Sequence, residues 1–131
     1  MSVRFRVLHS IIFAFFLVVA CSFTNNSTEQ EFTVDDFTQP MYKEFLFSID
    51  SVESKTQPGV FTQGIYKAEL CISGRITGEV GIINFGRERI VSGLVEECYR
   101  HDHYDDTYTL DIIPKESNVS GELDFKITLF H

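Results

Sequence analysis

The chain of 131 residues has no tryptophan, and only three prolines and three cysteines. It also lacks an apolar run of the roughly 20 residues that a helix needs to cross a bilayer, because the run 11–20 is too short. There is no Cys-X-X-Cys pair, no Gly-X-Ser-X-Gly nucleophile motif and no glycine loop for phosphate or a dinucleotide. We therefore expect no transmembrane helix, no enzyme activity and no cofactor, although the many carboxylates leave a glycosidase pair open.

Basic residues are scarce. The chain has 11 Lys and Arg against 19 Asp and Glu, a formal net charge of −8. Without residues 1–20, which include Arg4 and Arg6, nine of the 11 basic residues remain against 19 acidic ones, and the formal charge is −10. Nucleic acid and anionic membrane surfaces attract clusters of Lys and Arg, so we expect neither as a partner. A cationic protein partner, a divalent cation or plain solubility each fits this acidity.

The first 21 residues have the pattern of an export signal. Arg4 and Arg6 precede the apolar run 11–20, which ends with the small residue Ala20. Residues 17–21, Leu-Val-Val-Ala-Cys, resemble the lipobox of bacterial lipoproteins. The resemblance covers only this segment. It implies that residues 1–20 are a cleaved signal peptide, that the thiol of Cys21 carries lipid, and that the protein is anchored in the cell envelope. Ser22 after the cysteine then implies the outer membrane, facing the periplasm or the cell surface.

Two other kinds of export fit the same residues. Ordinary secretion would also cut after Ala20, and a eukaryotic secreted protein would use Asn25, Asn26 and Asn118 as glycosylation acceptors. The number of cysteines favours lipidation. An odd thiol is unfavourable in an oxidising compartment, whereas lipid on Cys21 leaves Cys71 and Cys98 to form a disulfide.

The remainder predicts one all-β domain. Residues 21–31 are polar and rich in Asn, Ser and Thr, which predicts a lipidated cysteine followed by a flexible tether, with a single β-domain over 32–131. Apolar and polar residues alternate along the segments 44–50, 66–73, 107–112 and 122–129, and we also predict strands over 80–85 and 90–99. This pattern predicts a small antiparallel β-sandwich or barrel. A short helix within 34–44 is an alternative, although Pro40 would interrupt it.

A Ser-Gly pair between apolar residues occurs three times, at 73–74, 92–93 and 120–121. The spacings of 19 and 28 residues are unequal, so the pairs do not mark a solenoid repeat. We expect these glycines to let the strands bend.

One short segment is dense in residues that bind ligands. We predict a binding loop of eight residues: Tyr99, His101, Asp102, His103, Tyr104, Asp105, Asp106 and Tyr108. Tyrosines beside an acidic rim are typical of protein-recognition surfaces. On an extended strand His101, His103 and Asp105 point the same way, which suits zinc or another transition metal. A calcium site would use Asp102, Asp105 and Asp106, but the segment lacks the glycine of a calcium loop. A solvated loop without function is the simplest alternative.

We therefore expect a non-enzymatic, lipid-anchored module that binds a protein. One version is an immunity or inhibitor protein that neutralises a cationic toxin in the periplasm. A structural accessory of an outer-membrane or cell-wall assembly is one alternative. A metal-binding domain that uses His101, His103 and Asp105 is another.

Overall fold

A computed structural model describes residues 26–131, which contain eight strands and no helix. The predicted signal peptide and Cys21 lie outside the described residues. No helix of residues 26–131 has the length and hydropathy needed to cross a bilayer. The all-β prediction is confirmed, and the alternative helix within 34–44 is not formed, because a loop and an antiparallel strand occupy this segment. The strands are β1 (Ser27–Val34), β2 (Met41–Leu46), β3 (Val52–Glu53), β4 (Phe61–Thr62), β5 (Lys67–Asn84), β6 (Arg87–Asp102), β7 (Thr107–Pro114) and β8 (Ser120–Phe130).

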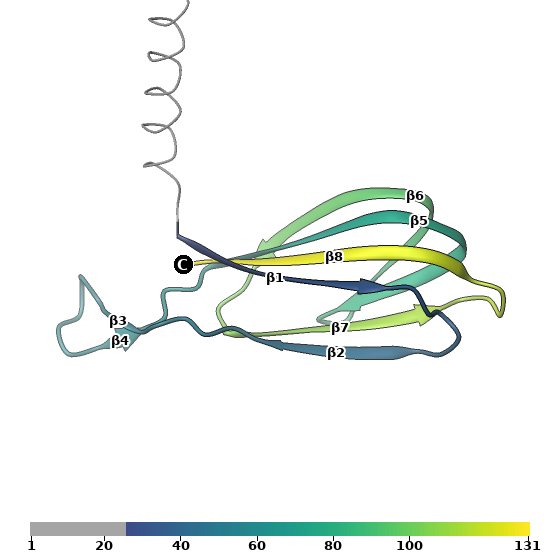
Figure 1. The fold of residues 1–131 in the computed structure, drawn as a ribbon. Helices are drawn as coiled ribbons and strands as arrows, with labels where there is room; N and C mark the ends of the chain where they lie inside the picture. The colour runs from purple at the N-terminus through teal and green to yellow at the C-terminus, as the bar shows by residue number, and fades with distance from the viewer. Residues whose placement is uncertain (1–25) are drawn as a thin grey trace, which may run out of the picture.

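Six strands form one antiparallel sheet that curls into a flattened, nearly closed barrel (Figure 1). The long strand β5 organises it. One edge of β5 pairs with β6 along its whole length, while the other edge pairs with β8 over 67–77 and with β7 over 80–83. β8 also pairs with β1, and β7 also pairs with β2. The β5–β6 ribbon therefore joins the two sides of the barrel.

The ribbon bends where the register between β5 and β6 shifts, between Ile76 and Glu79. The paired strands also approach closely beside this bend. A Cβ atom on Gly74 would lie 2.2 Å from the carbonyl oxygen of Glu122, and one on Gly121 would lie 2.2 Å from that of Arg75. Both glycines have positive φ, 137° and 118°. These positions need glycine, as the repeated Ser-Gly pairs predict.

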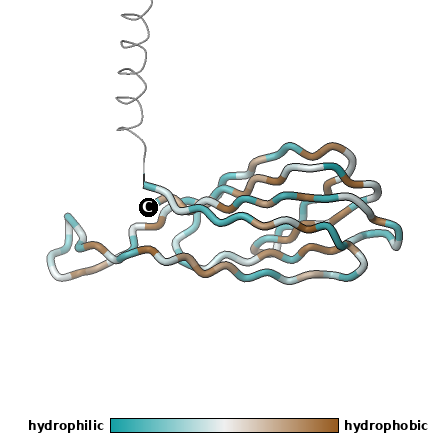
Figure 2. Tube along the Cα trace, viewed as in Figure 1, coloured by the Kyte–Doolittle hydropathy of each residue, from teal (hydrophilic) through white to brown (hydrophobic). Residues whose placement is uncertain are grey.

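The core follows from the alternation of the strands. Leu123, Phe125, Ile127 and Leu129 of β8 are all buried, and so are Tyr108, Leu110 and Ile112 of β7. Figure 2 shows hydrophobic and hydrophilic residues alternating along several strands of the barrel. Burial of these apolar side chains in one interior is the main driving force for folding.

β1 and β2 close the barrel without ladder pairing between them in the described structure. The ring of Phe32 in β1 lies 4.7 Å from that of Phe125 and 5.1 Å from that of Phe45 in β2, measured between centroids. Gln30 Nε2 also donates a hydrogen bond to the carbonyl oxygen of Leu46 at 2.8 Å. Side chains therefore hold this seam.

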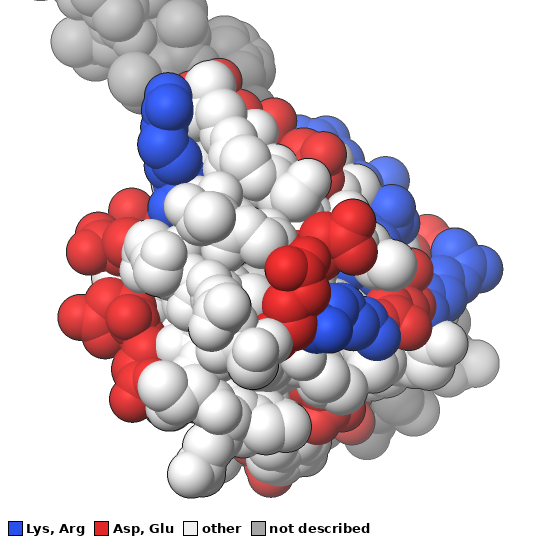
Figure 3. Space-filling view, turned by 90° about the vertical axis from the view of Figure 1, so that its right-hand side faces the viewer, with Lys and Arg blue, Asp and Glu red and all other residues white. Residues whose placement is uncertain are grey.

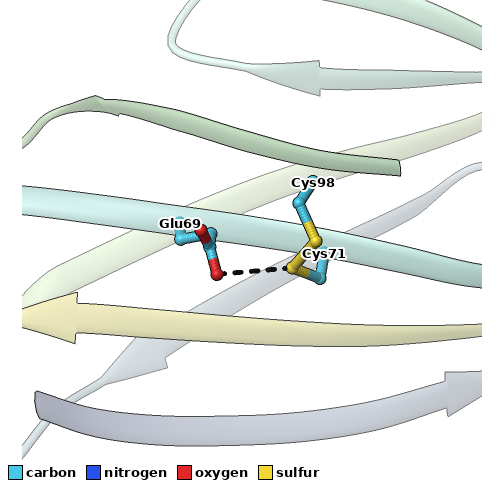
Figure 4. A group of neighbouring side chains, drawn as sticks. All are labelled: Glu69, Cys71 and Cys98. Carbon is cyan, nitrogen blue, oxygen red and sulfur yellow. Dashed lines mark hydrogen bonds between the residues drawn. A yellow bond between two sulfur atoms is a disulfide. The ribbon is translucent and has the colours of Figure 1, made fainter. Parts of the chain in front are cut away.

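The predicted disulfide between Cys71 and Cys98 is confirmed. The two residues lie directly opposite each other in β5 and β6 (Figure 4). Cys98 is exposed and Cys71 is half-buried, so the bridge lies on the outer face. Cys71 Sγ lies 3.5 Å from Glu69 Oε1. A disulfide sulfur carries no hydrogen to donate, so this is a packing contact.

The flexible tether ends earlier than predicted. Residues 27–31, assigned to it from their polarity, belong to β1 and pair with residues 126–130 of β8. β1 is an edge strand with mostly exposed or half-buried side chains, so its sequence is as polar as that of a linker. The domain therefore includes residues before 32.

Between β2 and β5 the chain makes a small projecting hairpin, residues 50–62, which we call the arm (Figure 1). Its strands β3 and β4 pair only with each other, through two residue pairs. None of residues 50–62 is buried. Val52, Val60 and Phe61 nevertheless expose large apolar side chains there, and Phe61 is 66% exposed.

Candidate functional site

A pocket of about 540 Å³ lies where the two ends of the bent β5–β6 ribbon meet. Arg87 and Arg89 come from the first half of β6, and Tyr99 and His101 come from its second half. In the register these four residues lie opposite residues 84, 82, 70 and 68 of β5, most of which are buried. Because residues paired in a ladder share a face of the sheet, the four side chains point toward the interior. The pocket is lined by Leu70, Ile82, Asn84, Phe85, Arg87, Arg89, Tyr99, Arg100, His101, Asp102 and Tyr108.

Four aromatic rings form one wall, contributed by Phe85, His101, His103 and Tyr108. Every pair of their centroids lies between 5.3 and 6.1 Å apart. Tyr108 is fully buried, whereas Phe85 is 57% exposed. The wall thus runs from the core to the surface.

Phe85 is held there by a strained turn. It occupies the first central position of the two-residue turn between β5 and β6, with φ 49°, and Gly86 follows with φ 76°. A bulky residue with positive φ is unfavourable, and such turns usually carry Asn or Gly at this position. The neighbouring Asn84 donates a hydrogen bond to the carbonyl oxygen of Thr109 at 2.8 Å, which fixes the turn against β7.

The pocket gathers positive charge in an acidic protein. Of the four arginines in residues 26–131, three line the pocket. Arg100 pairs with Glu69 at 2.5 Å, and the guanidinium of Arg89 lies 3.6 Å from the ring centroid of Tyr99. Within residues 26–131 neither Arg87 nor Arg89 has a carboxylate at ion-pair distance. Asp102 is the single carboxylate among the lining residues.

The surroundings also set the ionisation of the pocket. Burial, the neighbouring His103 and the charges of Arg89 and Arg87 lower the pKa of His101, while Asp102 opposes the shift. Burial raises the pKa of Tyr108, although Arg89 acts in the opposite direction. At neutral pH His101 is therefore an uncharged imidazole and Tyr108 is a protonated hydrogen-bond donor.

The structure brings part of the predicted binding loop into this site. Tyr99, His101, Asp102 and Tyr108 line the pocket, and His103 belongs to the aromatic wall. Tyr104 instead points into solvent and is 75% exposed.

Two acidic residues of the predicted loop stabilise the conformation of the loop. Asp105 accepts a hydrogen bond from the backbone N–H of Thr107 at 3.3 Å. Asp106 accepts one from Gln63 Nε2 at 3.1 Å, and this bond lowers the pKa of Asp106. These bonds fix the loop to itself and to the chain that leads into β5.

The suggested metal sites are not assembled. Within residues 26–131 the only three potential ligands whose donor atoms gather within 4.8 Å are Glu69, Cys71 and Cys98 (Figure 4). The two sulfurs of this group are joined in the disulfide and cannot act as thiolate ligands. His101, His103 and Asp105 do not meet as a ligand set, because the chain leaves the extended conformation after Asp102. The calcium set of Asp102, Asp105 and Asp106 does not meet either.

Sequence reasoning missed the half of the pocket that comes from the hairpin tip. Gly86-Arg87-Glu88 is recognisable as a hairpin connection, but nothing local shows that Arg87 and Arg89 return to face residues 99–101. The one unusual local feature is a phenylalanine where a two-residue turn favours Asn or Gly.

The pocket offers hydrogen-bond donors and positive charge beside aromatic and aliphatic walls, which suits binding of an anion with an apolar part.

Away from the pocket the surface is acidic. Figure 3 shows the end of the molecule opposite the arm, where acidic side chains form several groups with fewer basic ones between them. The ion pair between Lys115 and Glu88 is one of two in residues 26–131. Most acidic side chains therefore remain free to attract a cationic partner.

Comparisons with known proteins give no family. The chain matches no known family and no curated protein. Among solved structures it is similar to a de novo designed double-stranded β-helix, with 10% identity over 78% of this chain and 97% of that one, and a TM-score of 0.37. It is also similar to the Tobacco streak virus coat protein, with 10% identity over 83% and 90% of the two chains and a TM-score of 0.27. Disulfide-linked pili of Bacillus endospore appendages give 13% identity over 80% and 90%, and a TM-score of 0.28. Similarities of this size carry no information about function.

Proposed function

We propose that this chain is a lipid-anchored protein of the bacterial envelope, attached through Cys21, and that it binds another protein without catalysing a reaction. The attachment rests on the lipobox-like residues 17–21. The binding role rests on the arm. It exposes Val52, Val60 and Phe61 and contributes no buried residue to the core.

The arm is built as a docking element rather than as part of the fold. Two strands with two residue pairs bury too little surface to be stable without further contacts. A hydrogen bond from the backbone N–H of Gly59 to Glu53 Oε1, at 2.8 Å, helps to hold the turn. Exposed apolar side chains on such an element are a common mark of a protein-binding site.

Charge defines the partner. Asp50 and Glu53 lie in the arm, and Asp105 and Asp106 lie in the loop that Gln63 joins to its base. Lys55 is the one basic residue of the arm. A partner with a basic rim around an apolar centre would complement this surface, as a cationic toxin neutralised by an immunity protein would.

A paired comparison tests the binding role. Full-length protein is used to capture partners from detergent-solubilised envelope, in parallel with the arm variant Val60→Ser/Phe61→Ser and the control Leu94→Ser. Leu94 is 64% exposed, so the control removes a similarly exposed apolar side chain outside the arm. We expect one partner that the arm variant loses and the control keeps, and whose capture weakens as salt rises. Equal capture by all three proteins would exclude the arm as the site.

The anchor is tested separately. The intact mass of the mature protein should show loss of residues 1–20, added lipid, and two hydrogens fewer than the reduced chain because of the disulfide. The variant Cys21→Ser should leave the membrane fraction. A mass without lipid, or an unchanged fractionation of Cys21→Ser, would refute the anchor while leaving the binding role testable.

A further inference from the structure

The strand β6 carries polar residues at positions where a sandwich strand normally carries apolar ones. Arg87, Arg89, Tyr99 and His101 all point between the two sides of the barrel, and only Val91 and Val95 of β6 are buried. Arg87 and Arg89 line the pocket as exposed side chains, so their charges stay in contact with solvent and are accessible to a ligand. A ligand that fills the space between the two halves of β6 would supply partners for these polar groups.

The floor of the pocket contains a hydroxyl group without a partner. Tyr108 has no exposed surface, and within residues 26–131 its hydroxyl oxygen has no hydrogen-bond partner. The Nε2 atoms of His101 and His103 are likewise buried and unpaired within these residues. Buried polar atoms are nearly always paired in folded proteins, so the two that belong to lining residues, those of Tyr108 and His101, mark a place where a polar ligand atom belongs.

The arginines define the charge of that ligand. Arg100 is occupied by Glu69, whereas Arg87 and Arg89 have no carboxylate at ion-pair distance within residues 26–131. The guanidinium of Arg89 lies over the ring of Tyr99, and its planar set of N–H groups remains available to an acceptor. A planar carboxylate matches this geometry with two parallel hydrogen bonds.

The remaining walls define the rest of the ligand. Leu70 and Ile82 are apolar and buried, and the ring of Phe85 stands at the surface end of the aromatic wall. A volume of about 540 Å³ lies within the usual range for small-molecule sites. Inorganic phosphate could also accept hydrogen bonds from the two guanidinium groups, but it would leave the apolar walls uncovered.

We propose that this pocket binds a small organic carboxylate with a flat apolar body. The carboxylate accepts hydrogen bonds from Arg87, Arg89 and the hydroxyl of Tyr108, and the body packs against Phe85 and the aliphatic wall. The proposal goes beyond the protein-binding role. The arm does not line the pocket, so either function can fail without the other.

Calorimetric titration of the purified full-length chain tests the proposal with three probes. Phenylacetate carries the carboxylate and a flat ring, phenylacetamide replaces the charge with a neutral amide, and inorganic phosphate supplies the charge alone. We expect saturable binding of phenylacetate below about 10 mM, and at least about tenfold weaker binding of the other two. No saturable binding of phenylacetate would overturn the proposal, and so would equal or tighter binding of phosphate.

Three variants locate the binding. Arg89→Gln should weaken phenylacetate binding at least about tenfold, which corresponds to one lost charge-assisted interaction. Tyr108→Phe should also weaken it, while the unliganded variant keeps or raises its melting temperature because it removes an unpaired buried hydroxyl. Arg75→Gln, an exposed arginine on the outer face of β5, is the matched control and should bind as the unmodified chain does. If Arg89→Gln binds as tightly as Arg75→Gln, the proposed site is wrong.

Discussion

The guanidinium of Arg89 lies 3.6 Å from the ring centroid of Tyr99, although ten positions separate the two residues along one strand. A straight strand of that length would hold them about 33 Å apart. They meet because the β5–β6 ribbon bends through the register shift between Ile76 and Glu79. The bend thus closes the barrel and forms the pocket at the same time.

The first prediction concerns the close approach that accompanies this bend. Gly121→Ala would place a Cβ atom 2.2 Å from the carbonyl oxygen of Arg75, at a position with φ 118°. Gly121 in β8 and Arg75 in β5 belong to paired strands, so neither residue can move away easily. We expect a loss of about 2 to 3 kcal/mol in the free energy of unfolding, measured by chemical denaturation. The adjacent exposed residue provides the control, Ser120→Ala, which should change the free energy by less than about 0.5 kcal/mol. Equal stability of the two variants would contradict the geometry.

The second prediction concerns the disulfide across β5 and β6. Cys71→Ala/Cys98→Ala should lower the free energy of unfolding by about 3 to 4 kcal/mol, because a bridge closing a loop of this length restricts the unfolded chain. The sequence separation of the two cysteines is 27. Denaturation of the unmodified chain with and without a reducing agent gives an independent measurement. A midpoint that reduction does not shift would show that the bridge contributes no stability.

The sequence predicts the strands well because alternation depends only on neighbouring residues. Phe125 and Ile127 are buried as their spacing indicates, and Cys71 pairs with Cys98 as the cysteine count indicates. The pocket is different, since it depends on a bend that returns Arg89 to Tyr99. Such a long-range approach leaves no periodic pattern in the residues that meet. The prediction of a tether up to residue 31 is wrong for a related reason, because the exposed edge strand β1 needs few apolar side chains and is therefore polar.

The third prediction concerns the arm. Its residues 50–62 include none that is buried, and Lys55 lies within it, whereas several other basic residues lie within paired strands. Brief digestion with trypsin should therefore cleave first after Lys55, since proteases attack exposed segments with few contacts. Mass analysis of the first products identifies the site. The variant Lys55→Gln should remove this early cleavage without changing the melting temperature. Earlier cleavage after Arg75 or Lys126 would show that the barrel opens more readily than the arm.

The fourth prediction concerns pH and follows from the neutral imidazole of His101. Burial first, then His103, Arg89 and Arg87, lower the pKa of His101 below its ordinary value of 6.5, against the opposing charge of Asp102. In the unfolded chain the imidazole takes up a proton as the pH falls through about 6.5, whereas the folded chain takes it up only at lower pH. Between these two pKa values the unfolded state binds more protons than the folded state. The free energy of unfolding therefore falls as the pH is lowered through this range. Denaturation at a series of pH values from about 7.5 to 5 should show this slope, and His101→Gln should make it shallower. An unchanged slope in His101→Gln would mean that the imidazole is not held neutral by the pocket.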